Sequence, residues 1–184
     1  MAMNYRIHIF GASGAGTTTL SSLLAKRLKI PHLDTDEYYW IKTEIPYTEK
    51  REVNERVELL RTDLEKHSSW VLSGSLCGWG DFAITMFTLT VFLWIPHELR
   101  MARLREREIN LFGLEAISPS GWFHDNHQEF MSWAEKYDLA GTDMRSRALH
   151  EQWISKLPCK TIRFEQPLPA LEQAVRVEEV LGIR

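Results

Sequence analysis

A glycine-rich loop, set between an apolar run and a helical stripe of leucines, constrains the fold of this chain more than any other feature. Residues 6–10 (RIHIF) predict a buried strand, residues 11–18 read GASGAGTT, and one face of the following helix carries Leu20, Leu23, Leu24 and Leu28. Gly11, Gly14 and Gly16 allow positive φ angles and close approach to the backbone. Backbone N–H groups of such a loop point into one hollow at the helix start, whose partial positive charge favours anions. The stretch therefore predicts a phosphate-binding loop.

The spacing of this loop resembles the P-loop pattern G-x-x-x-x-G-K-[ST], with Thr17 at the position of the lysine. Thr18 fits the position whose hydroxyl contacts Mg²⁺. Because the P-loop lysine contacts the β- and γ-phosphates as a point charge, its loss should weaken triphosphate binding. A glycine-rich turn that holds no ligand is the alternative. The candidate nucleotide-binding residues are Gly11, Ala12, Ser13, Gly14, Ala15, Gly16, Thr17, Thr18 and Thr19.

Two aspartates follow the predicted second strand. The first helix should end near Lys29, because Pro31 disfavours helical geometry at the residue before it. A short strand then leads to LDTDEYYW, which contains Asp34 and Asp36. Ligands of an open parallel sheet bind beyond the carboxyl ends of the strands, so both carboxylates should lie beside the phosphate loop. Residues two apart in an extended segment lie on the same side of the backbone, so both carboxylates should face the ligand site. Asp34 would then face Mg²⁺, and Asp36 would face a substrate hydroxyl. A turn with a helix cap is the alternative.

Residues 97–113 predict a helix rich in arginine. Arg100, Arg103 and Arg107 share one face by the i, i+3, i+7 spacing, whereas Arg105 is turned away. A guanidinium binds phosphate oxygens bidentately and keeps its charge, so this face is a candidate phosphate clamp. The alternative is a surface helix whose ion-pair partners are Glu98, Glu106 and Glu108.

A second pair of arginines begins the next predicted helix, which should run to about residue 157. Arg145 and Arg147 are two residues apart and point to different sides, so only one should reach the phosphates. Before this helix, residues 111–141 carry glycine, proline and the sequence HDNH, which predicts a mobile lid followed by a helix. His124, Asp125 and His127 lack a second ligand pair at a recognised spacing, so no zinc site is expected.

The chain between the second and fourth strands predicts a charged helix and a glycine-rich loop. The buried stripe of the helix, at about residues 51–67, should consist of Val53, Val57, Leu60 and Leu64. The arginines that should face solvent or ligand are Arg51, Arg56 and Arg61. After a third strand in SWVLSGS (residues 69–75), Trp79 lies between Gly78 and Gly80. Close backbone approach and a flat indole suit an acceptor pocket, although a plain connection is the alternative.

The whole chain sets limits on size, partners and compartment. Its 184 residues suit one well-packed domain. Lysine plus arginine number 22 against 25 acidic residues, and a net charge of −3 gives no general attraction to nucleic acid or anionic membranes. Cys77 and Cys159 are too few for a disulfide framework, and the N-terminus enters a strand without a leader, so we expect a cytoplasmic protein. The most apolar run, residues 82–95, is too short and too rich in threonine to span a membrane.

Strands alternate with helices to the end of the chain. A fourth strand is predicted at residues 90–95 (TVFLWI), a fifth at 159–164 (CKTIRF), and a closing helix at 170–181. This alternation is typical of a parallel sheet covered by helices on both faces. We therefore expect an α/β fold and a single domain over residues 1–184.

Together these motifs resemble the adenylate kinase group of small P-loop kinases, which includes nucleoside monophosphate, shikimate and gluconate kinases. The resemblance covers nearly the whole chain and rests on GASGAGTT, DTD, a glycine after the third strand, VFLWIP before the arginine helix, and RSR before the last strand. DTD is more similar to the shikimate and gluconate kinases, where such a pair serves metal and acceptor. The chain departs from the group at Thr17, and at Ser73, where many relatives have an aspartate before Gly74.

The resemblance implies a three-layer P-loop NTPase fold, a five-stranded parallel sheet in the order 2-3-1-4-5, and a lid insertion. It implies an acceptor-binding arm at about residues 37–68 and the lid at about residues 111–141. ATP would lie across Gly11–Thr18 with Mg²⁺, and Arg103, Arg107 and Arg145 would surround its phosphates.

Two hypotheses of different class follow. The first is a kinase that uses ATP and Mg²⁺ to phosphorylate a nucleotide or a small hydroxylated metabolite, with Asp36 orienting the acceptor. The second is a nucleotide-binding module that has lost turnover and acts through a partner. The absent lysine favours the module, whereas Thr18, the carboxylate pair and the arginines favour the enzyme. A kinase-fold protein that binds nucleic acid is disfavoured by the net charge of −3.

Overall fold

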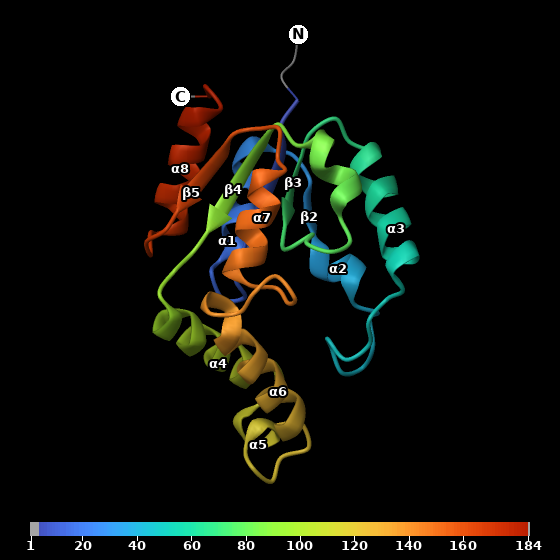
Figure 1. The fold of residues 1–184 in the computed structure, drawn as a ribbon, viewed down its shortest axis with the longest axis vertical. Helices are drawn as coiled ribbons and strands as arrows, with labels where there is room; N and C mark the ends of the chain where they lie inside the picture. Colours follow the sequence, from blue (N-terminus) through green and yellow to red (C-terminus); the bar gives the residue numbers. More distant parts are fainter. Residues whose placement is uncertain (1–3, 184) are drawn as a thin grey trace.

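The computed structural model describes residues 4–183, and its centre is a five-stranded parallel sheet with the order β2-β3-β1-β4-β5 (Figure 1). Residues 1–3, part of the N-terminus expected to lack a leader, and residue 184 lie outside this range. The strands are β1 (Arg6–Gly11), β2 (His32–Asp34), β3 (Trp70–Ser73), β4 (Leu89–Leu93) and β5 (Thr161–Phe164). All neighbouring strands pair in parallel, so the predicted α/β class and strand order are confirmed.

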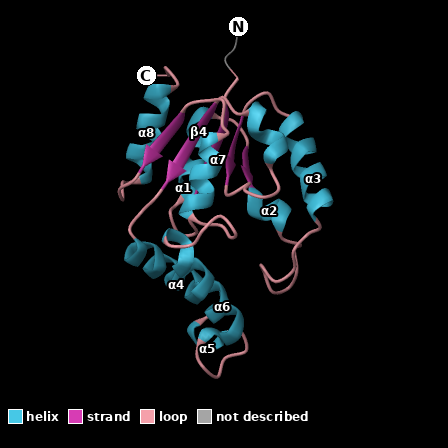
Figure 2. Ribbon diagram, viewed as in Figure 1, coloured by secondary structure: helices cyan, strands magenta, loops and turns pink. Residues whose placement is uncertain are grey.

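Helices cover both faces of the sheet (Figure 2). On one face lie α1 (Thr17–Leu28) and α8 (Ala170–Val180), and on the other lie α3 (Val53–Glu65), the 3₁₀ helix η1 (Asp81–Met86) and α7 (Arg147–Ser155). Helix α2 (Thr35–Tyr39) follows β2 directly. An arm beyond the carboxyl ends of the strands consists of α4 (His97–Phe112), α5 (Leu114–Ile117), α6 (His124–Glu135) and the 3₁₀ helix η2 (Lys136–Asp138). Within residues 4–183 no helix is both long enough and apolar enough to cross a bilayer.

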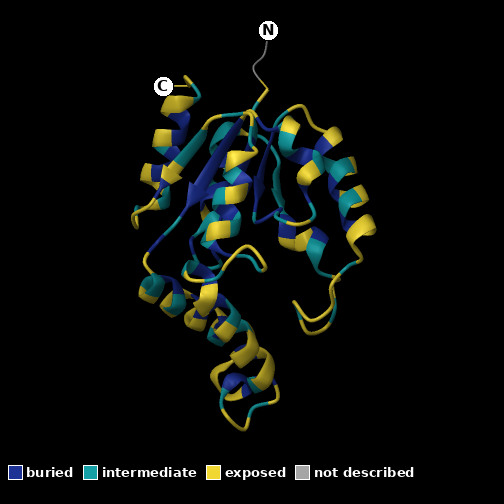
Figure 3. Cartoon of the chain, in the orientation of Figure 1, coloured by how far each residue is buried: buried dark blue, intermediate teal, exposed yellow. Residues whose placement is uncertain are grey.

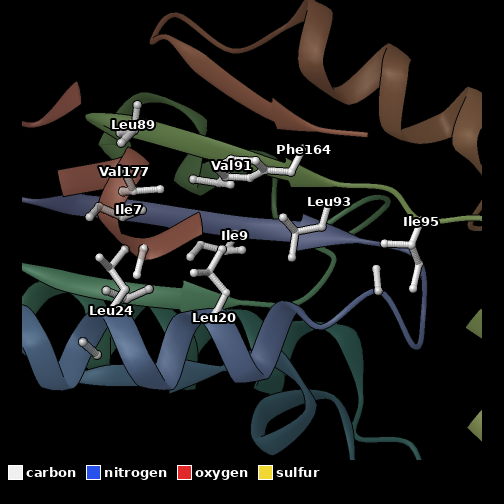
Figure 4. Close-up of a cluster of buried hydrophobic side chains, with 14 of the residues drawn as sticks. Ile7, Ile9, Leu20, Leu24, Leu89, Val91, Leu93, Ile95, Phe164 and Val177 are labelled. Atoms are coloured by element: carbon white, nitrogen blue, oxygen red, sulfur yellow. The ribbon is translucent and has the colours of Figure 1, made fainter. Parts of the chain in front are cut away.

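Strand β1 forms the middle of the core because its side chains are apolar on both faces. Ile7 and Ile9 pack against Leu20 of α1 and Val177 of α8 (Figure 4). Phe10 points to the opposite face, in the cluster beneath α3 and α7. All of these side chains are fully buried, and the central strands of the sheet are dark blue in Figure 3. At about 1.5–3 kcal/mol for each buried aliphatic or aromatic side chain, this layer holds the strand that leads into the glycine-rich loop.

Two histidines lie in the aromatic layer under α7. His8 of β1 stacks on Phe10 and Phe87 with ring centroids 4.8 Å apart in each pair, and its Nε2 lies 2.8 Å from the carbonyl oxygen of Gly74. His150 of α7 meets Phe10 edge to face at 5.4 Å. Burial lowers the pKa of His8 to about 4 and the pKa of His150 to about 3. Both side chains are therefore neutral in the folded protein near neutral pH.

The lid region is more regular than its sequence predicts. Residues 111–141 contain α5, α6 and η2, with turns limited to the short links between them. Leu104 of α4 packs with Met131 and Ala134 of α6, and the rings of Phe112 and Phe123 stack with centroids 3.9 Å apart. The glycines and proline of this region therefore mark turns between helices. The expected helix is present as α6, and the segment before it is itself helical at α5.

Helix α3 also differs from the prediction on its buried face. Leu60 and Leu64 are fully buried as expected, but Val53 is 48% exposed and Arg56 only 7% exposed. The guanidinium carbon of Arg56 lies 4.1 Å from the ring centroid of Tyr39, where cation–π attraction replaces the missing apolar contact. A pattern of apolar residues counts arginine as polar, so it could not find this contact.

We predict that Gly11→Ala destabilises the fold. A Cβ added to Gly11 would lie 2.2 Å from the carbonyl oxygen of Leu93, a backbone atom of the paired strand that cannot move away cheaply. The expected cost is at least 1–3 kcal/mol, roughly that of overpacking a core, in a urea unfolding measurement. The matched control is Gly141→Ala, whose Cβ would meet only the side chain of Asp143, at 3.2 Å. Equal stability of the two variants would contradict the prediction.

We also predict that stability falls as the pH drops below about 6.5. In the unfolded chain His8 and His150 bind protons near pH 6.5, whereas in the folded chain they stay neutral down to about pH 4 and about pH 3. Between these limits each histidine should remove about 1.4 kcal/mol of unfolding free energy per pH unit, and above pH 6.5 the loss disappears. Urea unfolding at several pH values measures this slope. His150→Gln should reduce it by about one histidine's share, and an unchanged slope would refute the assignment.

Candidate functional site

A cleft of about 990 Å³ lies beyond the carboxyl ends of the strands. Its lining comes from residues 11–19, the segment between β2 and α3, the side of α4, Arg145, and the loop between β5 and α8. Strand β1 lies between β3 and β4, so the cleft opens at the point of the sheet where successive connections turn to opposite sides. Its volume is at the upper end of the range of small-molecule sites.

The glycine-rich loop forms the floor of this cleft. All the candidate nucleotide-binding residues from Gly11 to Thr19 line it. Gly14 and Gly16 have φ angles of 82° and 99°, so the backbone bends twice through the left-handed region. Gly16 is the N-cap residue of α1 and offers no side-chain cap, which leaves the first N–H groups of the helix without a side-chain acceptor. This is the backbone geometry of an anion-binding loop.

The two metal candidates lie in contact with each other. The hydroxyl of Thr18 donates to Oδ2 of Asp34 at 3.0 Å, and Oδ1 of Asp34 accepts the backbone N–H of Asp36, also at 3.0 Å. Asp34 is therefore the N-cap of α2, which was the alternative interpretation, and a partner of the loop at the same time. A hydroxyl and a carboxylate that meet beside a phosphate loop are oxygen donors of the kind that Mg²⁺ prefers.

Asp36 lies in the first turn of α2, so the prediction of an extended segment was wrong at this residue. Its carboxyl nevertheless lines the cleft and is exposed there. Desolvation by the walls of the cleft raises the pKa of Asp36, the negative charge of Asp34 adds to the rise, and Arg145 and Arg107 oppose it. A carboxylate with a raised pKa in an open cleft is suited to accept a proton from a bound hydroxyl.

Three of the candidate arginines line the cleft, namely Arg103, Arg107 and Arg145. Nη2 of Arg145 donates to the hydroxyl of Ser13 at 2.6 Å, and its guanidinium carbon lies 4.6 Å from the ring centroid of Trp133. Desolvation lowers the pKa of Arg145, and Asp36 opposes that change. Since an arginine in a protein keeps its proton at neutral pH, the side chain is a fixed cation above the phosphate loop.

Arg100 and Arg147 do not belong to the cleft lining. Arg100 is fully buried, donates to the carbonyl oxygen of Ala134 at 2.8 Å, and pairs with Asp138 at 3.2 Å. It ties α4 to the end of α6, so its place in the predicted phosphate clamp was wrong. Arg147 pairs with Glu165 at 3.0 Å.

Sequence reasoning missed a polar chain that ends at the cleft. Ser75 lines the cleft, its hydroxyl oxygen lies 3.1 Å from Nε2 of His150, and Nδ1 of His150 lies 2.7 Å from the hydroxyl of Tyr137. Tyr137 is buried, so its proton is satisfied only if it donates to Nδ1, which places the histidine proton on Nε2, facing Ser75. The hydroxyl oxygen of Ser75 then accepts from His150, and it also accepts the backbone N–H of Cys77 at 3.4 Å. No local signal joins these residues, because they are far apart in the sequence.

The segments flanking α2 and β3 also differ from expectation. Lys42 and Tyr47, in the loop after α2, line the cleft. Trp79 is not part of the lining, and its ring lies 6.5 Å from that of Tyr39 and 5.6 Å from the guanidinium carbon of Arg56. The glycine-rich loop around Trp79 therefore supports α2 and α3 from behind, and its interpretation as a wall of the acceptor pocket was wrong.

Solved structures of small kinases share this fold. A shikimate kinase from Acinetobacter baumannii in complex with shikimate matches with a TM-score of 0.56 and 16% identity, over 99% of this chain and 96% of that chain. A shikimate kinase from Aquifex aeolicus matches with a TM-score of 0.54 and 21% identity, over 96% of each chain. A sugar kinase from Janibacter sp. HTCC2649 matches with a TM-score of 0.54 and 14% identity, over 98% of this chain and 96% of that chain. At these identities the similarity concerns the fold.

Sequence comparison identifies the family. The chain is 46% identical over 180 residues to the uncharacterized protein YqaC of Bacillus subtilis (strain 168), a match that covers 98% of this chain and 99% of YqaC. Residues 7–111, which contain the phosphate loop, Asp34, Asp36 and all of α4 except its last residue, match the profile of a family described as AAA domain. Because this profile spans more than half of the chain, the protein belongs to the AAA domain family of P-loop proteins and has the fold of the small P-loop kinases.

Proposed function

We propose that this protein is a kinase that uses ATP and Mg²⁺ to phosphorylate a small hydroxylated metabolite or a nucleotide. One observation carries the proposal. A single cleft contains an anion-accepting loop, the oxygen pair of Thr18 and Asp34, a carboxylate with a raised pKa at Asp36, and the cations Arg103, Arg107 and Arg145. Phosphoryl transfer needs these groups, because its catalysis consists mainly of positioning and charge neutralisation.

The proposed roles follow from where each group lies. The phosphates of ATP would lie along residues 11–19, Thr18 and Asp34 would hold Mg²⁺, and the cleft arginines would bind the phosphate oxygens. The metal supplies charge neutralisation when bound. The acceptor hydroxyl gives its proton to Asp36 as its oxygen bonds to the γ-phosphorus, while the bond to the bridging oxygen breaks and ADP leaves.

The arrangement of the chain supports two substrates rather than one. We infer a single domain in which residues 37–68 form the acceptor arm and residues 111–141 the lid. Lys42 and Tyr47 of the acceptor arm and Arg107 of α4 line the cleft, and so does the loop between β5 and α8. Two of the proteins with a similar fold are described as a shikimate kinase and a sugar kinase, which supports a small hydroxylated acceptor.

A nucleotide-binding module without turnover is the second candidate function. Thr17 favours it, because the loop lacks the lysine that normally stabilises the transferred charge. Such a module would bind ATP through the same loop and act through a partner. The two candidates therefore differ in turnover and agree in nucleotide binding.

Calorimetric titration with ATP and Mg²⁺, followed by a phosphoryl-transfer screen over nucleoside monophosphates and small hydroxylated acids and sugars, tests the proposal. Binding together with transfer to one acceptor class supports the kinase. Binding without transfer to any acceptor supports the module. If millimolar ATP does not bind, both candidates are wrong.

We predict that Asp36→Asn and Asp34→Asn separate the two carboxylate roles. Asp36→Asn should lower turnover about 10²- to 10⁴-fold, the usual contribution of a proton acceptor, with little change in ATP affinity. Asp34→Asn keeps a good N-cap for α2 but loses the charge facing Thr18, so it should raise the Mg²⁺ concentration needed for half-maximal binding of ATP. Transfer rates measured against Mg²⁺ concentration show both effects. If neither variant changes transfer, the aspartates serve only α2.

A further inference from the structure

Arg103 of α4 lies next to the place where the missing lysine would act. A Cβ added to Gly16 would lie 4.0 Å from Nη1 of Arg103 and would meet no other atom at that distance beyond its chain neighbours. Gly16 directly precedes Thr17, the residue at the lysine position. A guanidinium from a different helix therefore lies beside the start of α1, facing the hollow of the loop.

The packing of α4 against the loop fixes the position of the Arg103 backbone. Arg100, one turn earlier, is fully buried and paired with Asp138, and Leu104 is fully buried as well. A Cβ on Gly14 would lie 2.9 Å from the carbonyl oxygen of Arg100 and 3.1 Å from Cγ of Leu104. Since the backbone of α4 touches the loop at these residues, the side chain of Arg103 starts at the edge of the phosphate hollow.

Arg103 is also the cleft arginine without a partner in the described part of the chain. Arg145 donates to Ser13, and Arg107 lies 3.9 Å from Glu108, whereas Arg103 makes no hydrogen bond or ion pair within residues 4–183. A cation beside a helix N-terminus is electrostatically unfavourable unless an anion lies between them. Arg103 is exposed in the cleft, so an anion bound there at the N-terminus of α1 would be its natural partner.

We propose that Arg103 supplies from α4 the positive charge that a P-loop lysine supplies from the loop, binding the terminal phosphates of ATP. The proposal rests on the nucleotide site of the proposed function. Arginine suits the role because its planar donors bind two phosphate oxygens at once. Helix α4 forms one arm of the molecule together with α5, α6 and η2. The cation that binds the phosphates is then part of this helical arm, which flanks the cleft.

Calorimetric titration of Arg103→Ala with MgATP, MgADP and AMP tests this assignment. MgATP affinity should fall about ten- to hundredfold, as expected for a lost charge-assisted contact, and AMP affinity by less than about twofold. Arg105→Ala is the matched control, because Arg105 lies on the same helix, is exposed and does not line the cleft. It should bind all three nucleotides as the wild type does. Circular dichroism and urea unfolding confirm that both variants are folded.

Restoring the lysine distinguishes a replaced charge from a general loss. Thr17→Lys in the Arg103→Ala background should recover about tenfold or more of the MgATP affinity, whereas in the wild-type background it should gain much less. Such non-additivity is the result expected when both cations bind the same phosphates. Equal gains in the two backgrounds would overturn the proposal.

The remaining outcomes also decide the question. If the wild type binds MgATP and Arg103→Ala binds it equally well, the assignment of Arg103 is wrong while the nucleotide site stands. If Lys42→Ala loses MgATP affinity and Arg103→Ala does not, the cation that replaces the lysine is Lys42, which lines the cleft from the acceptor arm (residues 37–68). If the wild type binds no MgATP at millimolar concentration, the proposed function itself is wrong.

Discussion

The close packing of the glycine-rich loop against α4 is the contact on which the rest of the site depends. Gly14 has no side chain, and any added Cβ would meet the backbone of Arg100 at 2.9 Å. This approach brings the positive end of α1, the side of α4 and the carboxyl end of β1 to one place. Arg100 secures α4 from its far side by pairing with Asp138. The loop, the helix and the cleft between them are thus held as one unit.

Acidic and basic side chains of the cleft lie on opposite sides of this unit and do not form ion pairs with each other in the described part of the chain. The acidic groups Asp34 and Asp36 lie on the β2 side of the loop, and Arg103 and Arg145 lie on the α4 and α7 side. Partial desolvation raises the pKa of Asp36 and lowers the pKa of Arg145, so each group is held in surroundings that disfavour its charge. Sites that shift ionisable groups in this way are typical of bound ligands and catalysis.

How far the sequence predicted the site depended on how local each feature is. The loop from Gly11 to Thr19 and the aspartates lie where their motifs put them, because a motif fixes the backbone path and a strand end fixes the edge of the sheet. The contact of Ser75 with His150 joins residues 75 positions apart, and no sequence pattern carries it. The burial of Arg56 was missed because an aromatic partner from another element replaces apolar packing.

The sequence by itself determined the strand, the loop and the first helix, since glycine positions and apolar periodicity act on neighbouring residues. Alternating elements determined the α/β class, and the order of the strands followed from the family resemblance. Only the tertiary structure decided which arginines of α4 face the cleft. Arg100 and Arg103 share one helical face in the sequence, but α6 packs over Arg100 and leaves Arg103 beside Gly16. When two side chains share one helical face, the element that packs on that face decides which of them is buried and which faces the cleft. The sequence of the helix alone does not contain this information.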